Sequence, residues 1–251
     1  MSAIYGINAA MEALKADPAR IERISIQRGL ANPRLQAIID LARHAGVTLT
    51  FEERAWLDRK SAGGRHQGVI CHISAAAALS AEEVLSRASS PGLLLILDGL
   101  EDPQNLGGIL RSAEAAGVDG VLIPQRRSAG LTASAFKASA GAAAHLRIAR
   151  VSNTSRAIEL VKSSGYWVTG LAGGVGKSLW EVDFHGPTAL VAGSEGSGLH
   201  RLVSEKCDFL ASIPMRGKIG SYNVSVAAGI ALYEVLRQRC QMSASHKEKQ
   251  A

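Results

Sequence analysis

The chain has 251 residues, of which 47% are hydrophobic and 20% are charged, and its formal net charge is +6. This composition is typical of a globular protein and argues against a disordered chain. Its positive charge permits a polyanionic partner such as nucleic acid without requiring one. The three cysteines are too widely spaced for a disulfide framework or a CxxC metal site, which favours a reducing cytoplasm. Because no signal-peptide pattern or membrane-length apolar run is present, we expect a soluble intracellular protein.

Residues 1–73 predict a small α/β domain. Apolar periodicity indicates helices within 4–14 and at 33–45 and 54–57, with strands at 23–27, 47–51 and 69–73. A polar glycine-rich loop precedes the last of these strands. Residues 74–92 then read as a linker that contains or flanks a short helix.

From residue 93 the pattern changes to strands and helices in alternation. Strands are expected at 93–97, 120–123, 146–149, 167–171, 188–192 and 209–213, and helices at 106–116, 132–141, 154–164, 198–206 and 223–239. Such alternation predicts an α/β domain, residues 93–240, with a mostly parallel sheet. The polar tail, residues 241–251, is expected to be disordered.

The first chemically informative segment follows strand 93–97. Asn105 stands where a helix N-cap belongs, Gly107-Gly108 permits close approach, and Arg111 falls in the second turn. A tightly packed helix with a surface arginine is one interpretation. The other is a site for a phosphate-bearing substrate, shaped by the glycines and Arg111.

The second segment is the glycine turn 193–198. Its order G-x-x-G-x-G reverses the dinucleotide fingerprint, and Glu195 would repel a pyrophosphate, so no nicotinamide cofactor is expected. Residues 170–178 end in Gly-Lys-Ser, but a phosphate-binding loop would need glycine in place of Leu171. The histidines show no metal-ligand spacing, so no metal is expected either.

The third segment runs from Ser212 to Gly229. Pro214 ends a strand, a loop carrying Arg216 and Lys218 follows, and Ser221 or Asn223 caps the next helix. A helix N-terminus beside a basic loop suits an anionic or polar ligand, although an ordinary capped helix would have the same sequence.

In this order, residues 105–116, 191–199 and 213–229 resemble the three motifs of the SpoU (TrmH) family of S-adenosylmethionine-dependent RNA 2′-O-ribose methyltransferases, in the SPOUT superfamily. The resemblance covers 93–240. Residues 4–73, with the segments 5–9 and 65–69, are similar to the substrate-binding extension of the family's ribosomal RNA branch. The resemblance to this family implies a deep C-terminal trefoil knot and a homodimer whose active site is completed across the interface. It also implies methylation of a guanosine in the P loop of large-subunit ribosomal RNA.

The resemblance also implies roles for individual residues. The catalytic set would be Asn105, Arg111, Glu195, Ser221 and Asn223. Contacts to S-adenosylmethionine would come from Leu171, Gly193, Ile213, Met215 and Tyr222, and Tyr222 departs from the leucine usual in the family. Because an arginine with a pKa above about 12 is a poor base, Arg111 is expected to clamp a phosphate, which leaves Glu195 or the phosphate itself as proton acceptor.

Two other functions fit the same sequence: a transfer-RNA ribose methyltransferase and a non-catalytic RNA-binding or ribosome-assembly factor. Within residues 1–73, the loop 63–67 and Asn8 are expected to contact RNA, with Arg65 and Gln67 bonding and His66 stacking on a base. Alternatively, that loop merely turns the chain into strand 69–73. Helix 223–239 has apolar residues on more than one side and is expected to contribute to the dimer interface.

Overall fold

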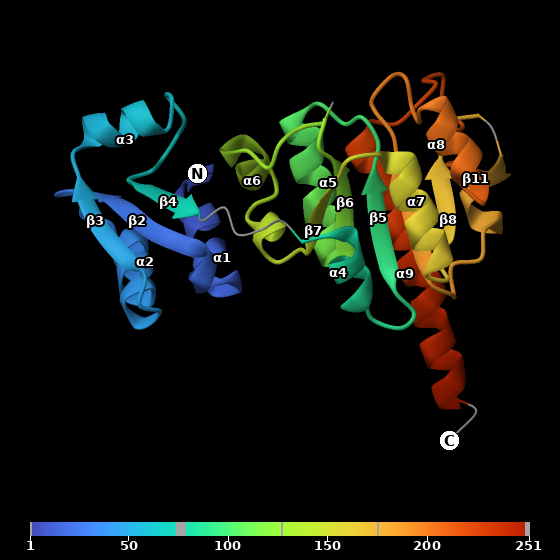
Figure 1. Ribbon diagram of the computed structural model, residues 1–251, viewed down its shortest axis with the longest axis horizontal. Helices are drawn as coiled ribbons and strands as arrows, with labels where there is room; N and C mark the ends of the chain where they lie inside the picture. Colours follow the sequence, from blue (N-terminus) through green and yellow to red (C-terminus); the bar gives the residue numbers. More distant parts are fainter. Residues whose placement is uncertain (1, 74–78, 127, 175, 249–251) are drawn as a thin grey trace. The chain divides into compact units, whose positions relative to one another are not determined.

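The structure is a computed structural model that describes residues 2–73, 79–126, 128–174 and 176–248. The chain divides into two compact units (Figure 1). Unit 1 comprises Met1–Ala77 and Ala129–His145, and unit 2 comprises Ala78–Ser128 and Leu146–Ala251. The start of the predicted linker, residues 74–78, lies outside the described residues.

Unit 1 contains a four-stranded sheet in the order β1-β4-β2-β3, formed by β1 (Ser2–Tyr5), β2 (Ile21–Gln27), β3 (Thr48–Glu52) and β4 (Val69–Ile73). Strands β2 and β3 are parallel, and the other pairs are antiparallel. Its helices are α1 (Ile7–Ala16), the 3-10 turn η1 (Pro18–Arg20), α2 (Pro33–His44) and α3 (Arg54–Lys60). Residues of α1 and α2 share one core with the buried side chains of the sheet. Strand β1 was not predicted because four residues are too few to show an alternating pattern.

A second segment of unit 1 comes from the middle of the chain. It carries α6 (Ala133–Ala138) and η2 (Ala142–Ala144). Phe136 packs against the unit 1 core, and His145 Nε2 lies 3.0 Å from Glu12 Oε2. The sequence predicts an uninterrupted domain over 93–240, whereas the structure assigns 129–145 to unit 1. Apolar periodicity locates a helix, but it does not say which core that helix will fill.

Unit 2 contains a seven-stranded sheet in the order β7-β6-β5-β10-β8-β11-β9, and all neighbouring strands are parallel. The strands are β5 (Leu93–Leu97), β6 (Gly120–Pro124), β7 (Ile148–Val151), β8 (Trp167–Leu171), β9 (Lys177–Ser178), β10 (Thr188–Ala192) and β11 (Phe209–Ser212). The predicted parallel α/β architecture is therefore confirmed. The implied trefoil knot stays a prediction.

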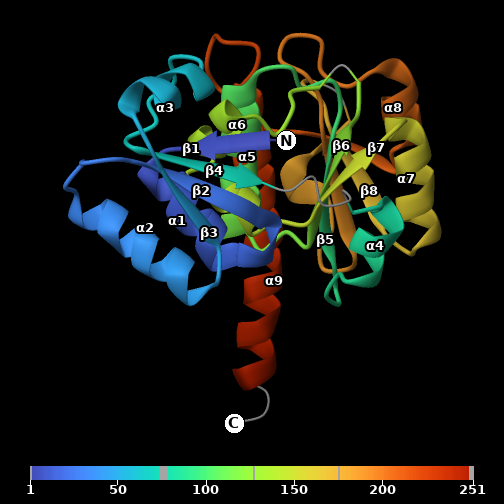
Figure 2. The ribbon, with the colours of Figure 1, turned by 60° about the vertical axis from the view of Figure 1, so that its left-hand side comes forward.

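Helices cover both faces of this sheet (Figures 1 and 2). One face carries α4 (Ala81–Ser86), α7 (Thr154–Ser163) and α8 (Arg201–Lys206); the other carries α5 (Pro103–Ala115) and α9 (Val224–Glu248), and a 3-10 turn, η3 (Leu179–Glu181), contacts α9. Strands β5 and β10 are buried along their whole length. This double coverage explains their continuous apolar sequences.

Helices α5 and α9 pack closely through small residues. A Cβ on Gly108 would stand 3.2 Å from the Cβ of Ser225, and one on Gly229 would stand 3.4 Å from Ser112 Oγ. Gly108 therefore faces a neighbouring helix, as the tight-packing interpretation of this segment predicts.

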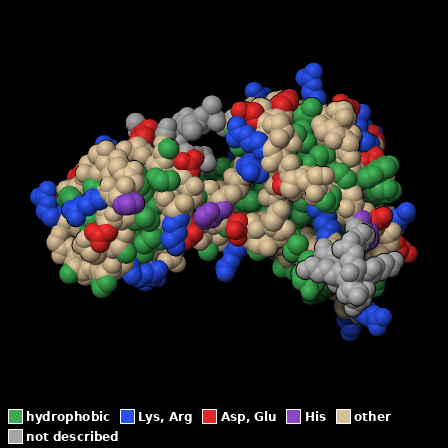
Figure 3. Space-filling model, turned by 90° about the horizontal axis from the view of Figure 1, so that it is seen from below, with side chains coloured by type: hydrophobic (Ala, Val, Ile, Leu, Met, Phe, Trp, Pro, Cys, Tyr) green, Lys and Arg blue, Asp and Glu red, His purple; other side chains and the backbone are tan. Residues whose placement is uncertain are grey.

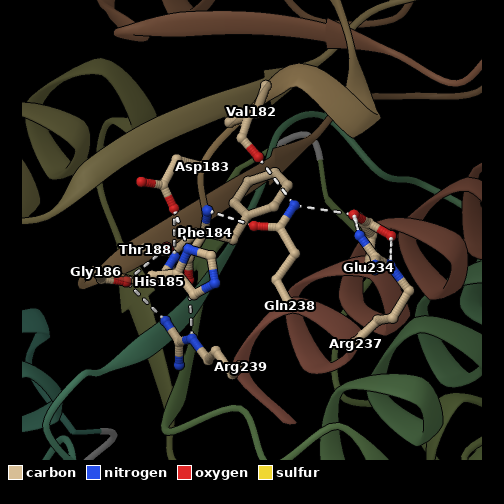
Figure 4. Close-up of polar contacts among 10 residues, drawn as sticks. All are labelled: Val182, Asp183, Phe184, His185, Gly186, Thr188, Glu234, Arg237, Gln238 and Arg239. Carbon is tan, nitrogen blue, oxygen red and sulfur yellow. Dashed lines mark hydrogen bonds and ion pairs between the residues drawn. The ribbon is translucent and has the colours of Figure 1, made fainter. Parts of the chain in front are cut away.

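The second half of α9 is tied to unit 2 by polar side chains (Figure 4). The Arg239 guanidinium donates to four backbone carbonyls, those of Pro91, Gly92, Phe184 and Gly186. Helix α9 continues to Glu248, through most of the segment expected to be a disordered tail, because its residues permit further helical turns. Residues 249–251 lie outside the described part of the chain. None of the described helices is long and apolar enough to cross a membrane.

Candidate active site

A cavity of about 840 Å³ lies at the carboxyl ends of β8, β10 and β11. In parallel sheets, ligands bind at this edge. All five residues predicted to contact the cofactor line this cavity: Leu171, Gly193, Ile213, Met215 and Tyr222. We call it the larger cavity.

The wall of the larger cavity is formed in part by the turn 194–198. Ser194 and Gly198 exchange two backbone hydrogen bonds, of 2.9 and 3.0 Å, that close the turn. Gly198 has φ +67°, a left-handed conformation that favours glycine. Gly193 lies against this turn so closely that a Cβ there would be 2.2 Å from the carbonyl oxygen of Gly198. The glycine spacing thus fixes a tight turn with Glu195 exposed on it.

Three predicted catalytic residues meet in one hydrogen-bond network. Asn105 Nδ2 donates to Glu195 Oε2 at 2.8 Å, and Asn223 Nδ2 donates to Asn105 Oδ1 at 2.8 Å and to Glu195 Oε1 at 3.4 Å. Asn223 Oδ1 accepts from the backbone N–H of Ser225 at 2.9 Å, so this side chain caps α9 as predicted. These partners fix the orientation of both amides and leave the Glu195 carboxylate with free lone pairs.

Helix α5 begins earlier than predicted. Asp102, not Asn105, is its N-cap: the Asp102 carboxylate accepts the backbone N–H of Gln104 at 2.9 Å, and Pro103 occupies the first helical position. Asn105 is then the third helical residue and only 6% exposed. Because the Asp102 carboxylate accepts the hydrogen bond of a backbone N–H at the helix N-terminus, the side-chain amide of Asn105 is available to the network.

The other two predicted catalytic residues do not join the network. Ser221 is exposed and lines the larger cavity. Arg111 is exposed and lines neither described cavity, and within the described residues it has no hydrogen-bond or ion-pair partner. A spacing of six residues places Arg111 about 120° around α5 from Asn105, which accounts for the separation.

A smaller cavity of about 380 Å³ lies on the other side of the turn, between residues 99–105 and 194–200. At its edge, His200 Nδ1 lies 2.9 Å from the buried Asp98 carboxylate, which also accepts the His200 backbone N–H at 2.8 Å. Neither residue was predicted from the sequence. The position of Asp98 directly after the buried strand β5 was the available signal.

The glycine-rich loop of unit 1 is held by its own side chains. His66 is buried, with Nε2 2.9 Å from Asp58 Oδ1 and Nδ1 accepting the Gly68 N–H at 3.0 Å. Gln67 Oε1 accepts the Ile7 N–H at the start of α1. His66 is therefore not free to stack on a base, and of the expected loop contacts Arg65 is the exposed cation.

On the face shown in Figure 3, basic and acidic side chains are interspersed. Within the described residues, no group of three His, Cys, Asp or Glu side chains is placed to hold a metal ion.

Comparison with known proteins matches both parts of the chain. The family model described as SpoU rRNA Methylase family matches residues 92–233. The chain belongs to this family. A second model, RNA 2′-O ribose methyltransferase substrate binding, matches residues 3–78.

Full-length relatives agree with this assignment. The chain is 42% identical over 239 residues to the 23S rRNA (guanosine-2′-O-)-methyltransferase RlmB of Pseudomonas aeruginosa, covering 94% of this chain and 96% of the relative. It is 42% identical to RlmB of Photorhabdus laumondii, covering 94% of this chain and 98% of that one. The fold matches the SpoU methyltransferase AviRb from Streptomyces viridochromogenes with a TM-score of 0.81 and 22% identity, over 95% of this chain and 90% of that one.

Proposed function

We propose that this chain transfers a methyl group from S-adenosylmethionine to the ribose 2′-oxygen of a guanosine in 23S ribosomal RNA. One observation carries the proposal: the cavity lined by all five predicted cofactor residues also contains Glu195, which is held by Asn105 and Asn223. Membership of the SpoU family and the names of the RlmB relatives support the reaction and the substrate. The P-loop position of the guanosine rests on the family resemblance alone.

The larger cavity fits the methyl donor. Its volume of about 840 Å³ lies within the range of roughly 300–1,000 Å³ typical of small-molecule sites. Apolar side chains such as Leu171 and Ile213 and the bare backbone at Gly193 provide a surface for a flat, partly apolar ligand. When bound, the donor supplies a methyl group on a positively charged sulfur.

The chain's own residues then position the acceptor. Methyl transfer by in-line displacement requires the 2′-oxygen to be aligned with the methyl carbon and to lose its proton. Asn105 and Asn223 hold the Glu195 carboxylate in one orientation, so its remaining lone pairs can accept a hydrogen bond from the 2′-hydroxyl. Arg111 would bind the adjacent phosphate and stabilise the developing alkoxide.

We further propose that the enzyme acts as a homodimer and that Arg111 of the partner subunit completes each site. Val226 and Tyr233 are 48% and 68% exposed on α9, and their spacing of seven residues places them on one face. Exposed apolar side chains on one helix face are typical of an interface. Because α5 packs against α9, Arg111 would lie close to such an interface.

Unit 1 is proposed to capture the RNA. The match of residues 3–78 to a substrate-binding family supports this role, and the exposed Arg65 is the candidate contact. Deleting everything before Ser90 would be a poor test, because α6 would lose the strand and helix against which it packs. Arg65→Glu should instead raise KM for the RNA without changing donor binding, whereas Arg43→Glu on α2 should not.

Ribose-methylation mapping of total RNA from cells with and without this protein tests the main proposal. Loss of one mark at a 23S guanosine is expected. A lost mark in transfer RNA would favour the transfer-RNA alternative. No lost mark, together with a defect in ribosome assembly, would favour a non-catalytic factor.

Calorimetry should show binding of S-adenosylmethionine and none of comparable strength for NAD or ATP. The proposal places the protein in the cytoplasm, where its RNA substrate is made.

A further inference from the structure

Two cavities share one wall. Ser194, Glu195 and Ser197 line both the larger and the smaller cavity, so the turn 194–198 separates them. If the methyl donor occupies the larger cavity, its acceptor must lie within bonding distance on the Glu195 side. The smaller cavity, which contains Asn105 and Glu195 and measures about 380 Å³, meets that condition. Its size is near the lower end of small-ligand sites, which suits one nucleoside turned out of its RNA strand.

His200 is fixed at the edge of the smaller cavity. Asp98 is 4% exposed, and its carboxylate accepts from both the backbone N–H and the ring Nδ1 of His200. In the neutral imidazole, a carboxylate partner keeps the proton on Nδ1, and Nε2 is then a hydrogen-bond acceptor. The ring also lies over the backbone of Gly99, where a Cβ would be 2.9 Å from His200 Cε1. Within the described residues, Nε2 has no hydrogen-bond partner.

Glu101 provides a second acceptor in the same cavity. Its carboxylate is exposed and, among the described residues, takes part in no hydrogen bond or ion pair. The neighbouring Asp102 is committed to capping α5. The cavity thus presents two uncommitted acceptors, His200 Nε2 and the Glu101 carboxylate, beside the catalytic network.

This arrangement matches one base. On its Watson–Crick edge guanine presents two adjacent donors, N1–H and the N2 amino group, whereas adenine and uracil each present one donor beside an acceptor. A site built from acceptors rejects bases that lack the donors, because its polar groups are then left unpaired. The carboxylates that line the smaller cavity would also repel a phosphate group placed in it, which favours a base as its occupant.

We propose that the smaller cavity receives the target nucleoside and that His200 and Glu101 select guanine by accepting hydrogen bonds from its N1–H and N2 amino groups. The inference rests on the proposed methyltransferase function and names how the same site would recognise its base. Asp98 acts through His200 and is a positioning residue.

The test uses one ribosomal RNA fragment with three bases at the target position: guanine, hypoxanthine, which lacks the N2 amino group, and 2-aminopurine, which lacks N1–H. Wild type should lose about tenfold in kcat/KM for each missing donor. Glu101→Ala and His200→Ala should each lower kcat/KM on the guanosine fragment about tenfold. Each variant should show no further loss on one of the two analogues, because the side chain that accepts from the missing donor has already been removed.

His185→Ala is the matched control. His185 bonds Asp183 as His200 bonds Asp98, through its backbone N–H at 3.0 Å and Nδ1 at 2.6 Å, but it lines neither cavity. It should behave as wild type on all three fragments. Calorimetric binding of S-adenosylmethionine should stay unchanged in every variant, which also shows that each has folded.

The inference would be overturned, and the proposed function left intact, by either of two results in both Glu101→Ala and His200→Ala. One is an equal loss of kcat/KM, relative to wild type, on all three fragments; the other is no loss on any of them. A wild-type protein that does not methylate the guanosine fragment would instead overturn the proposed function itself.

Discussion

Asn105 and Glu195 lie 90 residues apart in the chain and are joined by a 2.8 Å hydrogen bond from Nδ2 to Oε2. The sheet makes this possible. Strands β5 and β10 pair in parallel, with Leu97 beside Ala192, so the segments that follow them emerge at the same edge. Asn223, at the start of α9, then bonds to both side chains. The network therefore exists only when all three segments of unit 2 are folded together.

Asn105→Asp should break this network. The change replaces the amide that donates to Glu195 with a carboxylate, and like charges in contact repel. We expect the methylation rate to fall by roughly a hundredfold, as for other lost positioning contacts at reacting centres, with little change in S-adenosylmethionine binding. Single-turnover kinetics and calorimetry measure the two quantities. Glu114→Gln, an exposed change on the same helix, is the control. Near-normal turnover in Asn105→Asp would remove the network from catalysis.

Arg111→Ala should abolish methyl transfer while leaving donor binding nearly intact. If Arg111 clamps a phosphate in the transition state, the rate should fall by roughly two to three powers of ten. Arg111→Lys should recover part of this loss, because lysine offers a point charge without the bidentate fork. Full activity in Arg111→Ala would restore the surface-arginine interpretation.

Mixing two inactive variants tests whether Arg111 acts across a dimer. In a heterodimer of Arg111→Ala and Glu195→Gln, one site would combine an intact Glu195 with an intact Arg111 from the other subunit. Random exchange should then restore about a quarter of the wild-type activity. Mixtures that stay inactive although sedimentation shows heterodimers would place Arg111 in the same site as its own Glu195.

The sequence predicted the parts of unit 2 whose signals are local. The expected strands 93–97, 167–171 and 188–192 have the bounds of β5, β8 and β10, because short segments rich in apolar or β-branched residues and bounded by turn residues have few alternatives. The glycine turn 193–198 and the cap at Asn223 were placed correctly, since each is a local event, whereas the cap of α5 was not. The meeting of the motif residues in one network depends on strand order, which periodicity does not encode.

Non-local features were missed for the same reason. Residues 129–145 read as part of the large domain, and only tertiary packing shows that Phe136 fills the core of unit 1. The start of α5 was set at Asn105 although Asp102-Pro103 also fits a helix start, and two plausible caps three residues apart cannot be ranked from sequence alone. Asp98 and His200, 102 positions apart, formed no pattern at all.

Gly193→Ala should weaken donor binding. The added Cβ would stand 2.2 Å from the carbonyl oxygen of Gly198 and 2.5 Å from the backbone nitrogen of Leu199, and neither atom can move without shifting the turn. We expect the dissociation constant for S-adenosylmethionine to rise at least tenfold, or about 1.4 kcal/mol. Gly186→Ala, where a Cβ would meet nothing within 4 Å, is the control. Unchanged binding in Gly193→Ala would show that the turn is not part of the donor site.

The three cysteines should differ in reactivity. Burial raises the pKa of Cys71 to about 12, and burial aided by the neighbouring Asp208 carboxylate raises the pKa of Cys207 to about 12. Cys240 is exposed. Because the thiolate is the reacting form, a disulfide reagent at pH 8 should modify one thiol per native chain and three after denaturation. Cys240→Ser should remove the native reaction. Two rapidly reacting thiols in the native protein would contradict the burial of Cys71 or Cys207.

Glu234 should make the stability of unit 2 depend on pH. Its carboxylate accepts from Arg237 Nη2 at 2.7 Å and from Gln238 Nε2 at 2.9 Å, and Gln238 in turn bonds to the backbone of Val182 (Figure 4). Hydrogen bonding from Arg237 lowers the pKa of Glu234 despite the opposing effect of burial. The ionised form is therefore favoured in the folded state.

A lowered folded-state pKa contributes stability above the unfolded value of about 4.3, and this contribution is lost as the pH falls through the folded value. Glu234→Gln should accordingly reduce the free energy of unfolding by about 1–2 kcal/mol at pH 7. The difference from wild type should shrink below about pH 4, where the wild-type carboxyl is itself protonated. Urea denaturation at pH 7, 5, 4 and 3.5 measures it, with Glu114→Gln as the exposed control. A difference that stayed constant over this range would mean that the Glu234 carboxylate does not stabilise α9 through its charge.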